Sequence, residues 1–297
     1  KAAEAQYQNG NYDKAIAAYT SYIREFPNGL SILAALYQRA ESYFILKKYN
    51  EALPDYENLI TRGQSTYYAR SLRKAGLIAY NVKKDFGKAY NYYSQWTTIA
   101  TGDDLFEAQL GTVRSAYRLG GKSAEVYSLA EAVKGNAAAS QTDKGEAAFY
   151  IAKTALDDNN LSKAKTAFQE VTTSLSGEQK AEAFYQIAYI IFKQGQLSQA
   201  EQYILDKSAE VEDFADWLAR SYILLGDIYA QKGDYLNAQV YLEAVVDNYS
   251  GDDSIVQEAQ QKLDKVKQKD ANNSLLAPES NTGGNEGELE MEEDGGN

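Results

Sequence analysis

Few residues of this chain have both the type and the spacing that a catalytic or metal site needs. The 297 residues include no Cys and no His, which excludes thiolate zinc ligands, cysteine nucleophiles and the commonest general base. Gly120-Gly121-Lys122-Ser123 resembles the end of a phosphate-binding loop. That motif requires a glycine where Ala116 stands and a strand before it, and the sequence supplies neither. We interpret this segment as a turn between helices.

Adjacent carboxylates are the other candidates for chemistry, and they occur as Asp103-Asp104, Asp157-Asp158 and Asp252-Asp253. Such pairs can bind metal ions or act as general acid and base. Each pair falls at a predicted turn or helix start, where Asp caps the helix and complements its dipole. The sequence therefore predicts no catalytic residue, no metal site and no cofactor, and we interpret the chain as non-enzymatic.

The formal net charge of −12 is concentrated near the C-terminus. Residues 270–297 carry eight acids and no Lys or Arg, which leaves 34 acids against 30 bases in the rest of the chain. This balance argues against a nucleic-acid partner, because phosphate binding needs a basic face. No apolar run is long enough to span a bilayer.

One pattern recurs along the chain at a nearly constant interval. An aromatic residue or Leu follows a short polar turn, Ala comes three residues later, and a bulky residue comes four after that. The anchors of this pattern are Tyr12, Tyr49, Phe86, Leu161, Leu197 and Tyr235, at intervals of 37, 37, 75, 36 and 38 residues. A degenerate copy over residues 111–124 fills the double interval. Seven repeats result, the first of them truncated.

Each repeat has the periodicity of two amphipathic helices. The first helices carry small residues in equivalent places, which allow close helix approach: Ala40, Gly76, Gly111, Ala152, Ala188 and Gly226. The second helices carry Ala three residues after each anchor. Polar residues that follow the anchors are expected to cap the second helices, namely Asn50, Ser162 and Ser198.

The last copy resembles the tetratricopeptide-repeat (TPR) family, whose signature matches Leu225-Gly226, Tyr229, Gly233-Asp234-Tyr235, Ala238 and Leu242. The resemblance implies an all-α, right-handed superhelical solenoid of about seven helix pairs over residues 1–251. The intervals of 36–38 residues exceed the ~34 typical of the family, which predicts an extra turn or a longer loop in each repeat. Residues 252–269 are expected to form a capping helix, and 270–297 a disordered acidic tail.

In this family the first helices line a concave groove, and the groove positions can be transferred in register. They fall on rings and cations: Tyr37, Phe44, Arg70, Arg73, Tyr80, Phe149, Lys153, Tyr185, Tyr189, Phe192 and Arg220. Such a set is suited to binding a peptide, although several rings could instead pack between repeats. Some members of the family clamp a C-terminal carboxylate with Asn residues at fixed positions. In this chain those positions are occupied by Glu41, Leu77 and Thr112, so that clamp is not expected.

The resemblance implies an interaction scaffold that binds a protein or peptide partner in the groove. The long repeat, the Phe26-Pro27-Asn28 ending, the Tyr-rich helices and the acidic tail look most like large multi-TPR proteins of the Gram-negative envelope. This implies a location in the periplasm or at the periplasmic face of the outer membrane, with the cytoplasm as the alternative. Two other functions stay open: the recruiting region of an enzyme, and a peptidoglycan- or glycan-associated structural protein. Because Lys1 lies within a repeat, we expect the natural protein, and any catalytic domain, to extend upstream.

Overall fold

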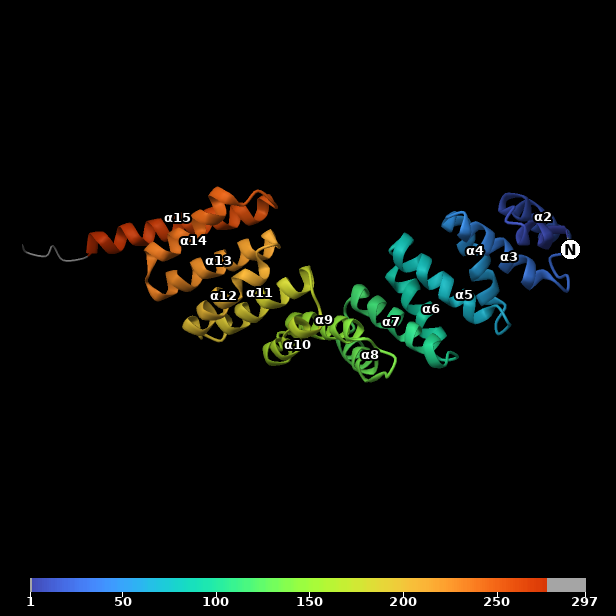
Figure 1. The fold of residues 1–297 in the computed structure, drawn as a ribbon, viewed down its shortest axis with the longest axis horizontal. Coiled ribbons are helices and arrows are strands. Elements are labelled where there is room, and N and C mark those ends of the chain that lie inside the picture. The colour runs from blue at the N-terminus through green and yellow to red at the C-terminus, as the bar shows by residue number, and fades with distance from the viewer. Residues whose placement is uncertain (1, 277–297) are drawn as a thin grey trace, which may run out of the picture.

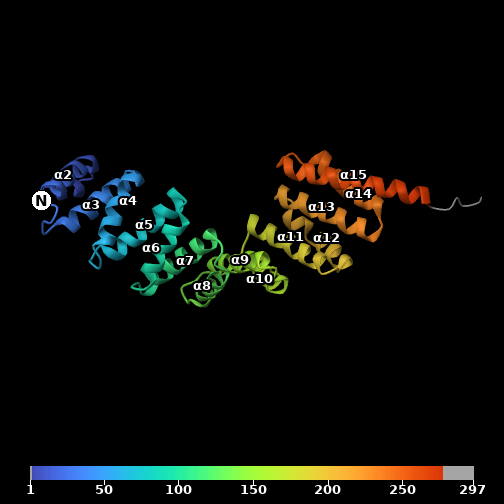
Figure 2. The same ribbon diagram turned by 180° about the vertical axis from the view of Figure 1, so that it is seen from behind.

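Stacked helices make up the whole of the described structure. The computed structural model describes residues 2–276, and within that range it contains α-helices and one π-helical segment but no β-strand. The helices follow one another along the longest axis, from the N-terminus at one end to α15 (Asp253–Leu276) at the other (Figure 1). The reverse view shows the same order (Figure 2). This is the all-α repeat solenoid that the sequence predicts.

Seven helix pairs correspond to the seven repeats. They are α1 (Ala2–Gln8) with α2 (Tyr12–Glu25), α3 (Ile32–Ile45) with α4 (Tyr49–Thr61), α5 (Tyr68–Leu77) and η1 (Ile78–Lys83) with α6 (Phe86–Thr97), α7 (Gly102–Leu119) with α8 (Ser123–Gly135), α9 (Gln141–Asp157) with α10 (Leu161–Ser174), α11 (Glu178–Lys193) with α12 (Leu197–Val211), and α13 (Ala215–Lys232) with α14 (Tyr235–Asn248). Each helix packs mainly against its neighbours in the chain, as expected of a solenoid.

The second helices begin two residues earlier than the predicted caps imply. Their anchors are the first helical residues, so the cap is the residue before the anchor. Asp85, Asn160 and Asp234 each accept a hydrogen bond from the backbone N–H three residues later, at 2.9–3.1 Å. The predicted caps are therefore wrong, because they lie inside the first turn: Asn50, Ser162 and Ser198.

The three acid pairs do not share one role. Asp103 and Asp104 lie in the first turn of α7, and Asp252 accepts from the Ser254 N–H at the start of α15, as predicted. Asp157-Asp158 lies at the C-terminal end of α9 instead. There Asp158 accepts hydrogen bonds from the hydroxyls of Ser123 and Tyr127, which lowers its pKa and ties α8 to α9.

The third repeat contains one residue more than the second between the small residue of its first helix and its anchor. Gly76 and Phe86 are ten residues apart, whereas Ala40 and Tyr49 are nine apart. The extra residue is absorbed by the π-helical segment η1, after which Lys84 adopts a left-handed conformation with φ of 54°. The insertion therefore stays local, and α6 continues the stack.

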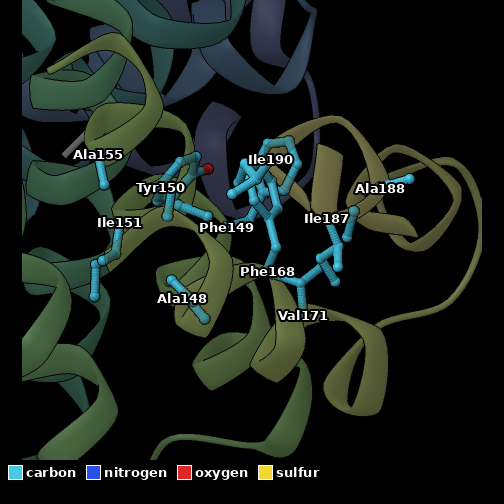
Figure 3. Packing of buried hydrophobic residues seen from close by; sticks show 14 of the residues in the cluster. Ala148, Phe149, Tyr150, Ile151, Ala155, Phe168, Val171, Ile187, Ala188 and Ile190 are labelled. Atoms are coloured by element: carbon cyan, nitrogen blue, oxygen red, sulfur yellow. The ribbon is translucent and has the colours of Figure 1, made fainter. Parts of the chain in front are cut away.

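Glycines let the helices of repeats three and four approach one buried ring. A Cβ on Gly76 would lie 2.8 Å from the ring of Tyr93, and a Cβ on Gly111 would lie 2.5 Å from it. Tyr93 is buried, and its burial raises the pKa of its phenol. A second large ring, Phe168, is completely buried within the hydrophobic cluster that runs through repeats four to seven (Figure 3). Large side chains of one helix thus occupy the space that small residues leave on the neighbouring helices.

The terminal helix α15 covers the last apolar face of the array. Leu263 and Val266 belong to one buried cluster with Leu242 and Val245 of α14. The helix extends to Leu276, so the predicted end at residue 269 is too early. The Gln239 amide donates a hydrogen bond to the Asp270 carboxylate at 3.0 Å and thus ties the extension to α14. The rest of the predicted disordered tail, 277–297, lies outside the described residues. Of the helices described, none has the length and apolar character needed to cross a membrane.

The glycine contacts generate a stability prediction. Replacement of Gly111 by Ala should lower the free energy of unfolding by about 1–3 kcal/mol, because the new methyl group overlaps the Tyr93 ring. Gly135, at the exposed end of α8, has nothing within 4 Å of its Cβ direction and provides the control. Gly135→Ala should be neutral or stabilising by up to about 1 kcal/mol. Urea denaturation followed by circular dichroism measures both, and equal stability of the two variants would contradict the packing described.

Candidate binding groove

Salt bridges connect the first helices of successive repeats. They link α3 to α5, α5 to α7, α7 to α9, α9 to α11, and α13 to α15, through Glu41–Lys74 (3.8 Å), Arg73–Glu107 (2.7 Å), Arg114–Glu146 (2.5 Å), Lys153–Glu182 (2.5 Å) and Asp227–Lys262 (2.6 Å). We call this series the salt-bridge ladder. Most of its members are partly buried, so their attraction is screened less by solvent than that of exposed pairs such as Arg73–Glu107.

The ladder is interrupted between α11 and α13. Lys153 directly follows the small residue Ala152, and Tyr189 directly follows the equivalent Ala188. Glu182 lies six residues before Ala188, as Arg220 lies six before Gly226. Tyr189 and Arg220 therefore occupy the places that a cation and an acid hold one repeat earlier. No salt bridge joins α11 to α13 in the described part of the chain.

A cleft opens where the ladder is interrupted. Its volume is about 680 Å³, and its lining includes Lys153 of α9, Tyr185 and Tyr189 of α11, and Trp217 and Arg220 of α13. The ring centroids of Tyr185 and Tyr189 are 6.2 Å apart with nearly parallel planes, and those of Tyr185 and Trp217 are 5.7 Å apart. Aromatic side chains from two repeats thus form one surface.

An adjoining recess extends this surface toward the terminal helix. It has a volume of about 250 Å³, shares Tyr185, Tyr189, Lys193 and Arg220 with the cleft, and adds Phe192. The two cavities together form what we call the C-terminal groove, across α9, α11, α13 and α15.

Two cations of the C-terminal groove lie over rings. The Arg220 guanidinium carbon is 5.8 Å from the centroid of Trp217, and the Lys193 ammonium is 5.3 Å from that of Tyr189. Neither cation forms a salt bridge with any carboxylate of residues 2–276. Burial raises the pKa of Tyr185 to about 12, while the charge of Arg220 opposes this shift. The phenol therefore stays neutral at pH 7 and can donate a hydrogen bond.

Sequence reasoning and structure agree on most of this groove. Five predicted residues line it, namely Lys153, Tyr185, Tyr189, Phe192 and Arg220. Phe149 does not, because its side chain is only 7% exposed and packs in the core near Tyr150 (Figure 3). The reason is that α9 is enclosed by α7, α8 and α10. For Phe149 the alternative of packing between repeats is correct.

The other five predicted residues lie in repeats two and three, away from this groove. Tyr37 stacks on Tyr67, with ring centroids 4.8 Å apart. Phe44 and Tyr80 each pack edge-on against the anchor ring of the next helix, Tyr49 and Phe86. Arg73 is held by Glu107, and Arg70 is exposed. The structure thus divides the predicted residues into two groups rather than one continuous surface.

Trp217 and Lys193, which take part in the cation–ring contacts of the groove, are missing from the sequence prediction. Trp217 has the helical spacing of a core residue, and only its position three residues before Arg220 signals a second role. Lys193 is the last residue of α11 and directly follows Phe192, which is predicted to lie in the groove. That adjacency is the sequence signal for Lys193.

Comparison with known proteins identifies the repeat at both ends of the chain. The tetratricopeptide repeat family matches residues 1–68 and 219–250. The C-terminal part of a TPR repeat-containing protein from Cytophaga hutchinsonii superposes with a TM-score of 0.58 at 16% identity, covering 86% of this chain and 97% of that one. A tetratricopeptide repeat protein from Parabacteroides merdae gives a TM-score of 0.43 at 14% identity, covering 88% and 96%. No curated protein sequence matches the chain.

The fold and the groove together define an α-solenoid, an architecture generally used as a non-catalytic interaction module. Tetratricopeptide repeats are identified at residues 1–68 and 219–250, and the helix pairs between these segments continue the same architecture. Within residues 2–276, no group of His, Cys, Asp and Glu side chains is arranged to hold a metal ion.

The ladder generates a second prediction. Glu182→Gln should reduce stability by about 1–3 kcal/mol, because Glu182 is only 12% exposed and its loss leaves the Lys153 ammonium without a counter-charge. Glu25→Gln breaks the exposed Arg24–Glu25 pair and should cost less than about 0.5 kcal/mol. Thermal unfolding compares the two. Lys153→Met combined with Glu182→Gln should recover part of the loss, and a double variant less stable than Glu182→Gln would refute this explanation.

Proposed function

We propose that this protein is a scaffold that binds a segment of a partner protein in the C-terminal groove. The observation that supports this most directly is the interrupted ladder. Neighbouring steps pair a cation with an acid, but at this step Arg220 forms no salt bridge with a described residue and lies beside Tyr185 and Trp217. Asp216 and Asp227 line the same groove without pairing with it. A carboxylate from a partner can form the salt bridge that Arg220 lacks within the chain.

The groove defines the chemistry of the segment it binds. An Asp or Glu side chain pairs with Arg220, whose planar guanidinium favours two parallel hydrogen bonds to a carboxylate. An apolar or aromatic side chain next to it packs on Tyr185 and Tyr189. Rings and arginines in a partly desolvated groove are the residues that most often dominate binding energy. Lys153 contributes less than its position suggests, because Glu182 already neutralises it.

The two alternative functions would require different ligands or domains in addition to the same groove. A glycan ligand would use the rings, but a guanidinium that forms no salt bridge with a described residue favours an anionic peptide group over a neutral sugar. A role as the recruiting region of a larger enzyme is compatible with the same binding mode. It requires a catalytic domain elsewhere in the natural protein.

For the place of action we propose the Gram-negative envelope, on the periplasmic side. The support is the sequence resemblance alone: the long repeats, the Phe26-Pro27-Asn28 ending and the abundance of Tyr. Fractionation of the source cells with an antibody against this chain tests it. Recovery in the cytoplasmic fraction would overturn the location without affecting the groove.

Peptide selection tests the binding proposal. A random dodecapeptide library displayed on phage is selected on the intact protein, and we expect enrichment of Asp or Glu next to an apolar or aromatic residue. Arg220→Ala should weaken a selected peptide at least ~10-fold, or ~1.4 kcal/mol, measured by fluorescence anisotropy. Arg24→Ala removes an arginine that is 75% exposed outside the groove and should change nothing.

Restoring the ladder provides a second arm of this test. Tyr189→Lys combined with Arg220→Glu places the residue types of the Lys153–Glu182 step at the interrupted step. This variant should fold with wild-type helicity and lose the selected peptide. Normal binding by both this variant and Arg220→Ala would show that partners use another surface.

A further inference from the structure

The side chains around Arg220 have counterparts four repeats earlier. Tyr185 lies three residues before the small residue Ala188, and Tyr37 lies three before Ala40. In the following repeat, Trp217 and Arg220 lie nine and six residues before Gly226. Tyr67 and Arg70 lie nine and six before Gly76. We name these the C-terminal cluster (Tyr185, Trp217, Arg220) and the N-terminal cluster (Tyr37, Tyr67, Arg70).

The two clusters have the same spatial construction. In each, a tyrosine of one first helix packs on an aromatic ring at the start of the next one. The ring centroids are 4.8 Å apart for Tyr37 and Tyr67, and 5.7 Å apart for Tyr185 and Trp217. Burial raises the pKa of both Tyr37 and Tyr185 to about 12, and in both cases the nearby arginine charge opposes the shift.

Repeats between the clusters place different residues at these positions. Glu146 and Glu182 stand where Arg70 and Arg220 stand, and both belong to the salt-bridge ladder. Asp143 and Gln179 stand where Tyr67 and Trp217 stand. The shared construction is therefore not a consequence of the repeat itself. It occurs in repeats two and three and again in repeats six and seven.

The N-terminal cluster is also open to a ligand. Tyr67 lines a recess of about 390 Å³, and Arg70 lines another of about 180 Å³ with Trp96 and Asp104. Arg70 forms no salt bridge with a carboxylate of residues 2–276. The larger recess also contains Gln38, whose buried side-chain oxygen accepts no hydrogen bond from any described residue. Two neighbouring recesses thus present a ring with an unused acceptor, Tyr67 with Gln38, and an arginine that forms no salt bridge, Arg70.

We propose that the array carries two equivalent binding sites, one at each cluster, and that a single partner protein occupies both with two copies of an acidic segment. The chemistry of that segment rests on the proposed function of the C-terminal groove. Charge complementarity supports this occupant, because each cluster presents one arginine that forms no salt bridge with a described residue. Two linked segments bind more tightly than one, because the second contact becomes intramolecular.

Calorimetric titration of the intact protein with the phage-selected peptide tests the number of sites. We expect two peptides per chain. Arg70→Ala and Arg220→Ala should each reduce this to one, and the double variant should bind none. Arg62→Ala provides the control, because Arg62 is exposed and its guanidinium bonds only Asn58 of the previous turn among described residues. Circular dichroism verifies that every variant keeps its helicity.

A tandem probe tests whether one partner can span both sites. Two copies of the peptide are joined by Gly/Ser linkers of about 20, 40 and 80 residues. The best linker should increase affinity at least ~10-fold over the single peptide, and Arg70→Ala or Arg220→Ala alone should abolish that gain.

The possible failures are distinguishable. One peptide per chain, lost in Arg220→Ala and unchanged in Arg70→Ala, would overturn the second site and leave the proposed function intact. Two sites without any avidity gain would overturn the single partner. Binding that neither arginine affects, or the absence of any selected peptide, would overturn both proposals.

Discussion

Each helix pair of this chain depends on its neighbours for burial of its apolar surface. The small residues at the helix contacts make that burial possible: Gly76 and Gly111 accommodate the ring of Tyr93, and Gly226 lies against Leu242. Because packing is limited to nearest neighbours, stability accumulates along the stack and the ends must be covered. The helix α15 provides that cover at the C-terminal end through Leu263 and Val266.

Because each helix packs mainly against its neighbours in the chain, part of its surface is not needed for packing. The core takes one face of each first helix, and the other face carries polar and aromatic side chains. At most steps these side chains form the salt-bridge ladder, which neutralises the surface while it links adjacent repeats. Where the ladder is interrupted, at Tyr189 and Arg220, the same backbone positions present rings and a cation. Two substitutions relative to the neighbouring step thus convert a structural contact into a candidate binding site.

Exposure of the predicted residues follows from the sequence where repeat position determines it. Tyr185, Tyr189, Phe192 and Arg220 follow the family's groove positions and line the groove. The prediction failed for Phe149, because the depth of α9 within the stack depends on how its neighbours curve around it. It was incomplete for Lys153, because whether a cation is available depends on the acid that the next repeat places beside it.

The sequence by itself determined the all-α repeat architecture, the number of helix pairs and the residues at their contacts. These properties follow from helical periodicity and from a recurring unit, both of which are local. Only the tertiary structure decided which rings are covered and which charges are paired. Glu182 and Arg220 occupy equivalent positions six residues before a small residue, yet one completes a salt bridge and the other lies beside an open cleft. The physical reason is that burial and ion pairing across repeats depend on side chains brought together by stacking, about 30 or more residues apart in the chain.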